Sequence, residues 1–365
     1  MKKFEAFIHS LIKKRILPGI SLLVGKGEEI LLKKHYGYKS LLPQKEMLKE
    51  NTLYDLASLT KPLITALLTL YLVEKEKKIT LNTNIRKFFP LLAFDINLLH
   101  LLTHTSGLPA WYPFYLYGED YTDQFKSLKL ESRPGKKVNY SCVGYILLYY
   151  IIEKIAGTSF KEFAQKIIFE PLGLKNTFLF VPEDLKKFAA PTENGNHYEK
   201  RLAEKKDKKM ANHFFWRDYI LQGETHDCNS WYLGGTAGNS GLFSTTEDVF
   251  RITREFSPST TSILAPESTH HFRENLTPFK KSHRTIGFKR NSSFITSGGR
   301  ALSREAIGHN GVTGTSLWLE PKGGYTFILL TNRIHPVMKD EKQVGFNRIR
   351  RKLHRMIVKN LEIER

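Results

Sequence analysis

The stretch Ser58-Leu59-Thr60-Lys61-Pro62 is the most informative part of the chain. A serine and a lysine three positions apart lie on one face of a helix, where the amine can take the serine proton. Proline is tolerated in the first turn of a helix, so Pro62 predicts a helix that begins near Ser58. The helix dipole at that end favours an oxyanion and predicts a lowered pKa for Lys61. The tetrapeptide alone favours the other interpretation, in which Ser58 is a helix cap.

The same spacing recurs at Ser10 and Lys13, and the surrounding sequence separates the two matches. Residues 2–15 place apolar side chains at helical spacing, which predicts an amphipathic helix lying on a core. Ser10 falls inside that helix. Ser58 stands where a helix starts, and it is therefore the candidate nucleophile.

Other catalytic signatures are missing from the sequence. There is neither a G-x-S-x-G elbow nor a P-loop. His226-Asp227 and His270-His271 lack the spacing of a zinc site, and Gly238-Asn239-Ser240-Gly241 is read as a glycine turn. Two cysteines exclude a disulfide framework and a four-cysteine zinc site. We therefore expect no metal and no cofactor.

The order of the predicted elements indicates an α+β fold. Residues 18–38 predict two strands joined by a turn, and strand patterns return at 285–296, 315–320 and 325–331. The segment between them is mostly helical, with a long helix from Ser58 to about Lys77 and an exposed, lysine-rich excursion at 183–212. A last helix is expected over 341–363. We expect one sheet built from both ends of the chain, with a helical insert.

Four further segments follow the first one in a fixed order. They are Leu101-Leu102-Thr103-His104-Thr105-Ser106-Gly107-Leu108-Pro109, Tyr140-Ser141-Cys142 after Pro134-Gly135, Gly241-Leu242-Phe243-Ser244-Thr245, and Gly308-His309-Asn310-Gly311-Val312-Thr313-Gly314-Thr315. With this ordered set the chain resembles the serine β-lactamase and penicillin-binding-protein superfamily, and most closely its class C β-lactamase-related branch of esterases and D-amino-acid peptidases. The resemblance covers roughly residues 15–355.

The resemblance implies an antiparallel sheet flanked by helices, an α/β/α sandwich built from both termini, with a mostly α-helical inserted domain. We place the sandwich at residues 1–64 and 206–365, and the helical domain at 65–205. The active site is expected between them.

The resemblance also implies roles for individual residues. Ser58 corresponds to the nucleophile, Lys61 to its proton acceptor, and Tyr140 to the tyrosine that shuttles a proton to the leaving group. His309 and Gly311 belong to a strand edge that lines the substrate site. The backbone N–H groups of Ser58 and Val312 would form the oxyanion hole.

Two departures from the pattern bear on the substrate. Cys142 stands where the second motif usually has Asn, and a thiol binds an amide or a lysine only weakly; Cys142 is otherwise a small buried hydrophobe. His309 stands where β-lactamases have Lys, and a neutral histidine gives less charge for a substrate carboxylate. We therefore expect an esterase or a D-amino-acid-type peptidase. The alternatives are β-lactamase or penicillin-binding activity, or a catalytically weak protein that binds cell-wall fragments.

His104 and the aromatic stretch after it are expected to have structural roles. His104 is expected to close a turn ahead of the helical domain. The five aromatics between residues 111 and 117 are expected to pack in the core, with an acyl-binding pocket as the alternative reading.

The charge balance leaves the partner open. Lys and Arg number 56 against 36 Asp and Glu, a net charge of +20. The basic residues are spread out, with dense stretches only at 200–209 and 279–290, so we expect a small-molecule substrate and no specific nucleic acid. Without a signal peptide or a transmembrane segment the sequence predicts a cytoplasmic protein; it does not fix the oligomeric state.

Overall fold

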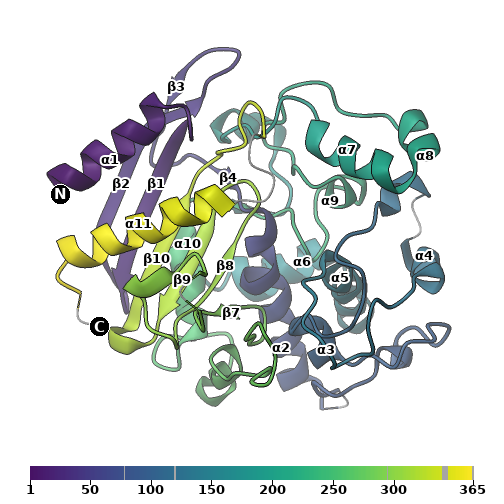
Figure 1. Cartoon of the computed structure of the whole chain (residues 1–365). Helices are drawn as coiled ribbons and strands as arrows, with labels where there is room; N and C mark the ends of the chain where they lie inside the picture. Colours follow the sequence, from purple (N-terminus) through teal and green to yellow (C-terminus); the bar gives the residue numbers. More distant parts are fainter. Residues whose placement is uncertain (78, 119–120, 294, 339–343, 364–365) are drawn as a thin grey trace.

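Strands from the two ends of the chain pair in one seven-stranded antiparallel sheet, with the order β3-β2-β1-β10-β9-β8-β7. In this computed structural model, residues 1–77, 79–118, 121–293, 295–338 and 344–363 are described. The strands of this sheet are β1 (Gly19–Lys26), β2 (Glu29–Ser40), β3 (Glu46–Met47), β7 (Lys289–Arg290), β8 (Ile307–Asn310), β9 (Ser316–Glu320) and β10 (Tyr325–Leu330). The pairing of β1 with β10 joins the two ends of the chain, as the sequence predicts (Figure 1).

The sheet buries both of its faces. Side chains alternate between the faces of a strand, so Leu22 and Leu23 point to opposite sides. Leu22 packs with α1 (Lys2–Lys13) and α11 (Val344–Asn360), which lie side by side across one face (Figure 1). Leu23 packs with α10 (Thr246–Thr253) and the helical half of the molecule on the other face. This is the expected antiparallel sheet flanked by helices.

The helical half lies beside the large sheet (Figure 1). A smaller sheet has the order β4 (Tyr54–Asp55), β6 (Phe243–Ser244), β5 (Thr177–Phe178). The remaining helical segments, in which η marks a 3-10 or π turn, are η1 (Ala57–Leu59), η2 (Lys61–Ala66), α2 (Leu67–Lys75), η3 (Ile85–Lys87), α3 (Leu98–Leu102), η4 (Phe114–Leu116), α4 (Tyr121–Ser127), α5 (Cys142–Ala156), α6 (Phe160–Ala164), η5 (Gln165–Phe169), η6 (Glu183–Phe188), α7 (His197–Lys206), α8 (Lys208–His213), α9 (Cys228–Tyr232), η7 (Arg254–Phe256), η8 (Pro266–Phe272), η9 (Gly299–Ala301) and η10 (Lys322–Gly324).

One helical run, Ala57–Lys75, is long and apolar enough to cross a membrane by length and composition. Of its apolar window, 78% is buried inside the protein, which is the burial of a core helix. It includes η1, η2 and α2 and therefore carries Ser58 and Lys61 through the centre of the molecule. The predicted helix start near Ser58 is confirmed.

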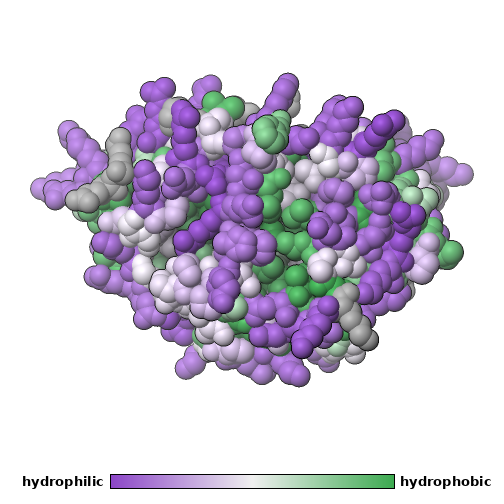
Figure 2. All heavy atoms as spheres, turned by 90° about the horizontal axis from the view of Figure 1, so that it is seen from below, coloured by the Kyte–Doolittle hydropathy of each residue, from purple (hydrophilic) through white to green (hydrophobic). Residues whose placement is uncertain are grey.

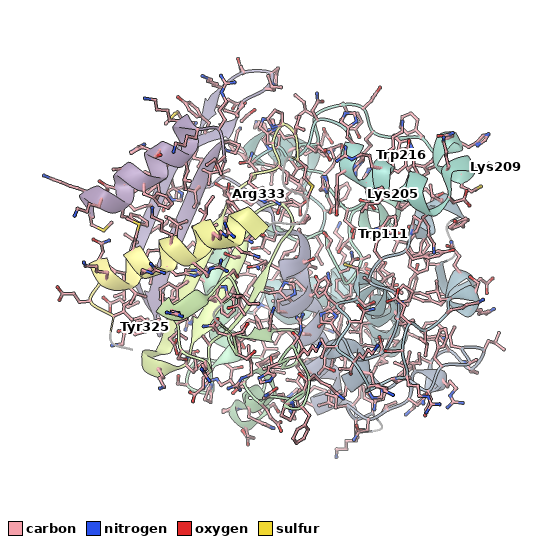
Figure 3. All side chains as sticks on the ribbon, viewed as in Figure 1. Trp111, Lys205, Lys209, Trp216, Tyr325 and Arg333 are labelled. Atoms are coloured by element: carbon pink, nitrogen blue, oxygen red, sulfur yellow. The ribbon has the colours of Figure 1, made fainter. Side chains whose placement is uncertain are left out.

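Two local predictions are wrong. Among the described residues of 285–296, only Lys289–Arg290 form a strand. The stretch 183–212 is not a simple exposed excursion, because it forms α7 and α8 and buries Glu199 and Ala203. Lys205 of α7 and Lys209 of α8, labelled in Figure 3, are among the exposed residues of this helix pair. The proposed domain boundaries stay a prediction.

The outer surface agrees with the interpretation of most of the charge as a solvated exterior. Figure 2 shows hydrophilic residues over most of the face seen from below, around hydrophobic atoms nearer its middle. The exposed apolar side chains of the chain include Leu91, Phe215 and Phe279, which come from separate segments.

The unequal burial of two isoleucines on adjacent strands gives a test of the sheet packing. Ile20 in β1 is fully buried, whereas Ile30 in β2 is 39% exposed. We expect Ile20→Ala to lower the free energy of unfolding by about 3 kcal/mol, since it removes buried methyl groups and leaves a cavity. Ile30→Ala should cost less than about 1 kcal/mol. Urea denaturation of both variants measures the difference, and equal losses would contradict the assigned faces.

Candidate active site

Ser58 and Lys61 lie within hydrogen-bond distance at the start of the central helical run. Lys61 Nζ is 3.0 Å from Ser58 Oγ and 3.4 Å from Cys142 Sγ, and it donates to the carbonyl of Asn239 at 2.9 Å. The side chain of Lys61 is fully buried. Three segments that are far apart in the sequence therefore meet at one ammonium group.

The turn before Ser58 is strained and tightly held. Ala57 has φ +48°, a conformation that is costly for any residue with a Cβ. Its N–H donates to Asp55 Oδ1 at 2.8 Å, while Asp55 Oδ2 accepts from the backbone N–H of His226 at 2.8 Å. The carboxylate of Asp55 thus holds the backbone of Ala57, the residue before Ser58. It also connects this turn to the segment that carries Asp227.

The third motif is pinned to the same turn. The hydroxyl of Thr313 donates to the carbonyl of Asp55 at 2.8 Å, and that of Thr315 to the carbonyl of Leu56 at 3.0 Å. A Cβ on Gly311 would lie 2.6 Å from the Leu56 carbonyl oxygen and 2.1 Å from Thr315 Oγ1. Glycine is therefore needed where the edge of β8 approaches the nucleophile turn, and Val312 then lies beside Ser58 in the lining of one cleft.

Tyr140 is positioned by the segment around His104. The ring of His104 packs against the ring of Tyr140 at 4.5 Å between centroids, and His104 Nδ1 accepts the N–H of Ser141 at 3.1 Å. The ring of Tyr140 lies 5.1 Å from Lys61 Nζ. His104 thus has a structural role: it holds the loop that places Tyr140 next to Lys61.

Electrostatics around Lys61 differ from the expectation. Burial lowers the pKa of Lys61, but Cys142, Tyr140 and Asp227 raise it, and the net shift is upward, so the predicted lowered pKa is wrong. Burial raises the pKa of Tyr140, against the Lys61 charge and hydrogen bonds with Ser58 and Lys61 that lower it. Burial likewise raises the pKa of the Cys142 thiol, which makes it a poor nucleophile.

His309 lies at the end of β8 with its ring 5.8 Å from that of Tyr140. Burial, followed by the charges of Lys61 and Arg284, lowers its pKa well below the usual range, so the imidazole is neutral. His309 Nδ1 is 3.0 Å from the carbonyl oxygen of Asn310. A neutral ring held in this way can form a hydrogen bond with a substrate but brings no charge to it.

Five of the seven predicted site residues line one cleft of about 480 Å³, together with Arg284 and Lys289: Ser58, Tyr140, Cys142, His309 and Val312. Lys61 is buried behind this lining, in contact with Ser58 and Cys142. Gly311 lies next to the cleft. Arg284 is 7% exposed, and its guanidinium is 5.7 Å from the centre of the Tyr140 ring. Among the described residues neither Arg284 nor Lys289 has a carboxylate partner. The sequence analysis missed both residues, although they lie in its dense basic stretch 279–290.

The cleft also contains a carboxyl pair that the sequence analysis missed. Glu199 of α7 and Asp227, which caps α9, both line it. Burial, followed by the charge of Asp227, raises the pKa of Glu199 to about 7. Its position three residues into a lysine-rich helix gave no signal, because the lysines around it point to solvent.

Remaining aromatics and histidines have structural positions. Phe114 and Tyr115 are buried, as expected, while Trp111 lines the cleft and, with Trp216, packs beside α7 (Figure 3). His226 pairs with Glu193 at 3.0 Å. Away from the cleft, His270, His271 and Glu274 place one potential metal-ligand atom each within 4.8 Å of the others, on the surface.

The raised pKa of Glu199 predicts a pH-dependent stability difference. The fold binds the proton of Glu199 more tightly than the unfolded chain, so this contribution is complete below about pH 4.5 and is lost as the pH rises through about 7. A rise from 4.5 to about 7 corresponds to about 3 kcal/mol. We expect Glu199→Gln to stabilise the protein at pH 8 relative to wild type and much less at pH 5. Urea unfolding at both pH values tests this, and a pH-independent gap would contradict it.

Comparison with known proteins places this geometry in a family. The beta-lactamase family profile matches residues 4–348. A protein of Salmonella enteritidis PT4 named as a D-alanyl-D-alanine carboxypeptidase is 30% identical over 371 residues, which cover 89% of this chain and 81% of the Salmonella protein.

Solved structures share the fold at low sequence identity. EstCE1, a hydrolase with promiscuous acyltransferase activity, is 17% identical with a TM-score of 0.73 over 97% of this chain and 98% of its own. A class C beta-lactamase is 18% identical with a TM-score of 0.73 over 100% and 97% of the two chains. The penicillin-binding protein homologue of Pyrococcus abyssi, an octamer, is 22% identical with a TM-score of 0.69 over 95% and 76%. From the family profile along nearly its whole length, and from the Salmonella relative, the chain belongs to the beta-lactamase family.

Proposed function

We propose that this protein is a serine hydrolase that forms an acyl-enzyme at Ser58 and releases a leaving group that ends in a carboxylate, as a D-amino-acid-type carboxypeptidase does. The observation that carries the proposal is the pair of cations, Arg284 and Lys289, in the same cleft as Ser58, whose hydroxyl contacts Lys61. A buried guanidinium without a protein carboxylate is a strong site for a substrate carboxylate. The name of the Salmonella relative agrees with this substrate class.

The first step is attack of Ser58 Oγ on the substrate carbonyl. The carbonyl π electrons move to oxygen, and the backbone N–H groups of Ser58 and Val312 stabilise the oxyanion. Because Gly311 lets β8 come close to the nucleophile turn, these two backbone segments face the same space. The clamp of Thr313 and Thr315 holds this arrangement before substrate arrives, which limits the reorganisation that the reaction requires.

Proton transfer is assigned to Lys61 and Tyr140 together. The pKa of Lys61 is raised, and its Nζ lies 3.0 Å from Ser58 Oγ, so an ammonium–tyrosinate form and an amine–phenol form of the pair both place a base next to Ser58. The pair takes the Ser58 proton, and Tyr140 then protonates the leaving amine as the C–N bond breaks. Water attacks the acyl-enzyme with the same pair as base and frees Ser58.

An ester substrate is the second candidate. Cys142 occupies the position from which Asn would bind an amide, and its Sγ lies 3.4 Å from Lys61 Nζ. Ester hydrolysis needs no such amide contact, which favours the esterase activity expected from the sequence. A β-lactam also carries a carboxylate, so penicillin binding remains the alternative that labelling distinguishes. The small-molecule substrate and the cytoplasmic location stay predictions.

Ser58→Ala tests the acyl-enzyme. We expect wild type to release D-alanine from Nα,Nε-diacetyl-L-lysyl-D-alanyl-D-alanine or p-nitrophenol from p-nitrophenyl acetate. The variant should lose at least about a thousandfold in kcat/KM, because it lacks the hydroxyl that lies 3.0 Å from Lys61 Nζ. Intact mass after fluorophosphonate or penicillin treatment should show one adduct, mapped to Ser58. Ser10→Ala serves as the matched control for the second serine–lysine pair. Equal turnover by wild type and Ser58→Ala would overturn the assignment.

Arg284→Gln tests recognition of the carboxylate. Loss of a charge-assisted contact corresponds to about 1.5–3 kcal/mol, so we expect about a 10- to 100-fold lower kcat/KM on the carboxylate peptide. The C-terminal amide of the same peptide should lose much less. Lys281→Gln, in the same basic stretch but exposed, is the matched control. An equal loss on both peptides would show that Arg284 supports the fold and does not bind the substrate.

A further inference from the structure

The end of the cleft at α7 and α9 carries two carboxyl groups that form no ion pair among the described residues. Glu199 is 4% exposed; its Oε2 accepts the N–H of Cys228 at 3.0 Å, while its Oε1 has no hydrogen-bond partner in the described part of the chain. Asp227 accepts from the N–H of Ser230 and from Asn239 Nδ2. Among the described residues neither carboxyl group forms an ion pair.

Other polar atoms at this end also lack partners. Ser240 lines the cleft, and its buried hydroxyl has no hydrogen-bond partner among the described residues. The buried hydroxyl of Tyr115 also has none there; Tyr115 does not line the cleft, but the charge of Glu199 helps to raise its pKa. Buried polar atoms are nearly always satisfied in folded proteins. Glu199 and Ser240 both line the cleft and each has an unsatisfied oxygen, which marks a place where a donor from a ligand is expected.

We propose that Glu199, with Asp227 beside it, binds an ammonium group in the acyl part of the substrate. This inference rests on the proposed function, since it assigns the acyl side of that reaction. An ammonium has three N–H donors and a full positive charge, and it satisfies both an orphaned carboxylate oxygen and a hydroxyl acceptor. A substrate that fits both ends of the cleft has a carboxylate in its leaving group and an amine in its acyl group.

The position of Tyr140 decides which end holds the acyl group. Tyr140 protonates the leaving group, and the guanidinium of Arg284 lies 5.7 Å from its ring, so the leaving group lies at the basic end. The charge of Arg284 lowers the pKa of His309 and of Lys289, and Tyr140 raises the pKa of Arg284. The charge of Glu199 instead raises the pKa of Tyr115 and of Cys228. Figure 1 shows β7 and α7 on opposite sides of the central helix α2. The carboxyl end therefore faces the acyl group.

The state of Glu199 depends on the groups packed around it. Asp227 raises its pKa, the N–H of Cys228 lowers it, and His226 and Arg217 lower it further, with burial the largest influence and a result of about 7. Binding is therefore measured at pH 8, where the carboxylate form dominates. A bound ammonium adds a positive charge beside this group and favours that form further.

The test measures binding without turnover. In the Ser58→Ala protein, isothermal titration calorimetry compares D-alanyl-D-alanine with its N-acetyl derivative, and Nα-acetyl-L-lysyl-D-alanyl-D-alanine with its Nα,Nε-diacetyl derivative. Each pair has the same carboxylate and differs in one ammonium group. We expect the free amine of at least one pair to bind at least tenfold more tightly. In Ser58→Ala/Glu199→Gln, which keeps an acceptor for the N–H of Cys228, this preference should fall below about threefold.

Glu204→Gln in the same Ser58→Ala background is the matched control, because Glu204 lies on α7 outside the lining of the cleft and should leave the preference intact. Circular dichroism melts of all variants show that the fold is retained. No preference in Ser58→Ala, no binding of any of the four peptides, or a preference that survives Glu199→Gln each overturns the proposal. Failure of wild type to form a Ser58 adduct would instead overturn the proposed reaction, which this binding test does not use.

Discussion

The buried ammonium group of Lys61 is the constraint on which the rest of the site depends. A charge in the interior is costly unless hydrogen bonds replace its water. Lys61 reaches Ser58, the carbonyl of Asn239 and the thiol of Cys142, which come from the helix start, a glycine turn and the first turn of α5. The same three contacts that stabilise the charge therefore bring the two halves of the cleft together around Ser58.

The nucleophile turn shows how the fold keeps strain in place. Ala57 adopts a left-handed conformation next to Ser58, and hydroxyl groups of Thr313 and Thr315 hold the two carbonyls before it. Because these threonines follow β8, the edge of the large sheet determines the geometry of a turn that lies in the helical half. The pairing of β1 with β10 matters for chemistry for the same reason, since it fixes the sheet to which β8 belongs.

Local pattern was sufficient for much of this architecture. The alternation in residues 18–38 and 325–331 and the helix start at Pro62 are properties of neighbouring residues, and the structure has the strands and the helix there. Contacts with the backbone of segments far away in the sequence could not be predicted from local pattern. Asn239 binds Lys61 through its carbonyl, which every residue has, so the glycine turn around it gave no sign of this contact. The predicted strand at 285–296 is reduced to two residues because a turn precedes it, in which Gly287 has φ +75° and the N–H of Thr285 donates to the carbonyl of Phe288.

Charge was the feature that the sequence left most ambiguous, and location resolves it. Arg284 and Lys289 lie in the cleft, whereas Lys205 and Lys209 are exposed on the surface of α7 and α8, although both pairs come from dense basic stretches. Glu199 follows the same logic with opposite sign, since it lies in the lysine-rich hairpin yet faces inward. Ionisation of this buried carboxyl group near neutral pH lowers the free energy of unfolding, so stability does not account for its presence. Glu199 and the guanidinium of Arg284, which has no carboxylate partner among the described residues, lie at opposite ends of one cleft. A substrate that carries both charges explains the two groups together.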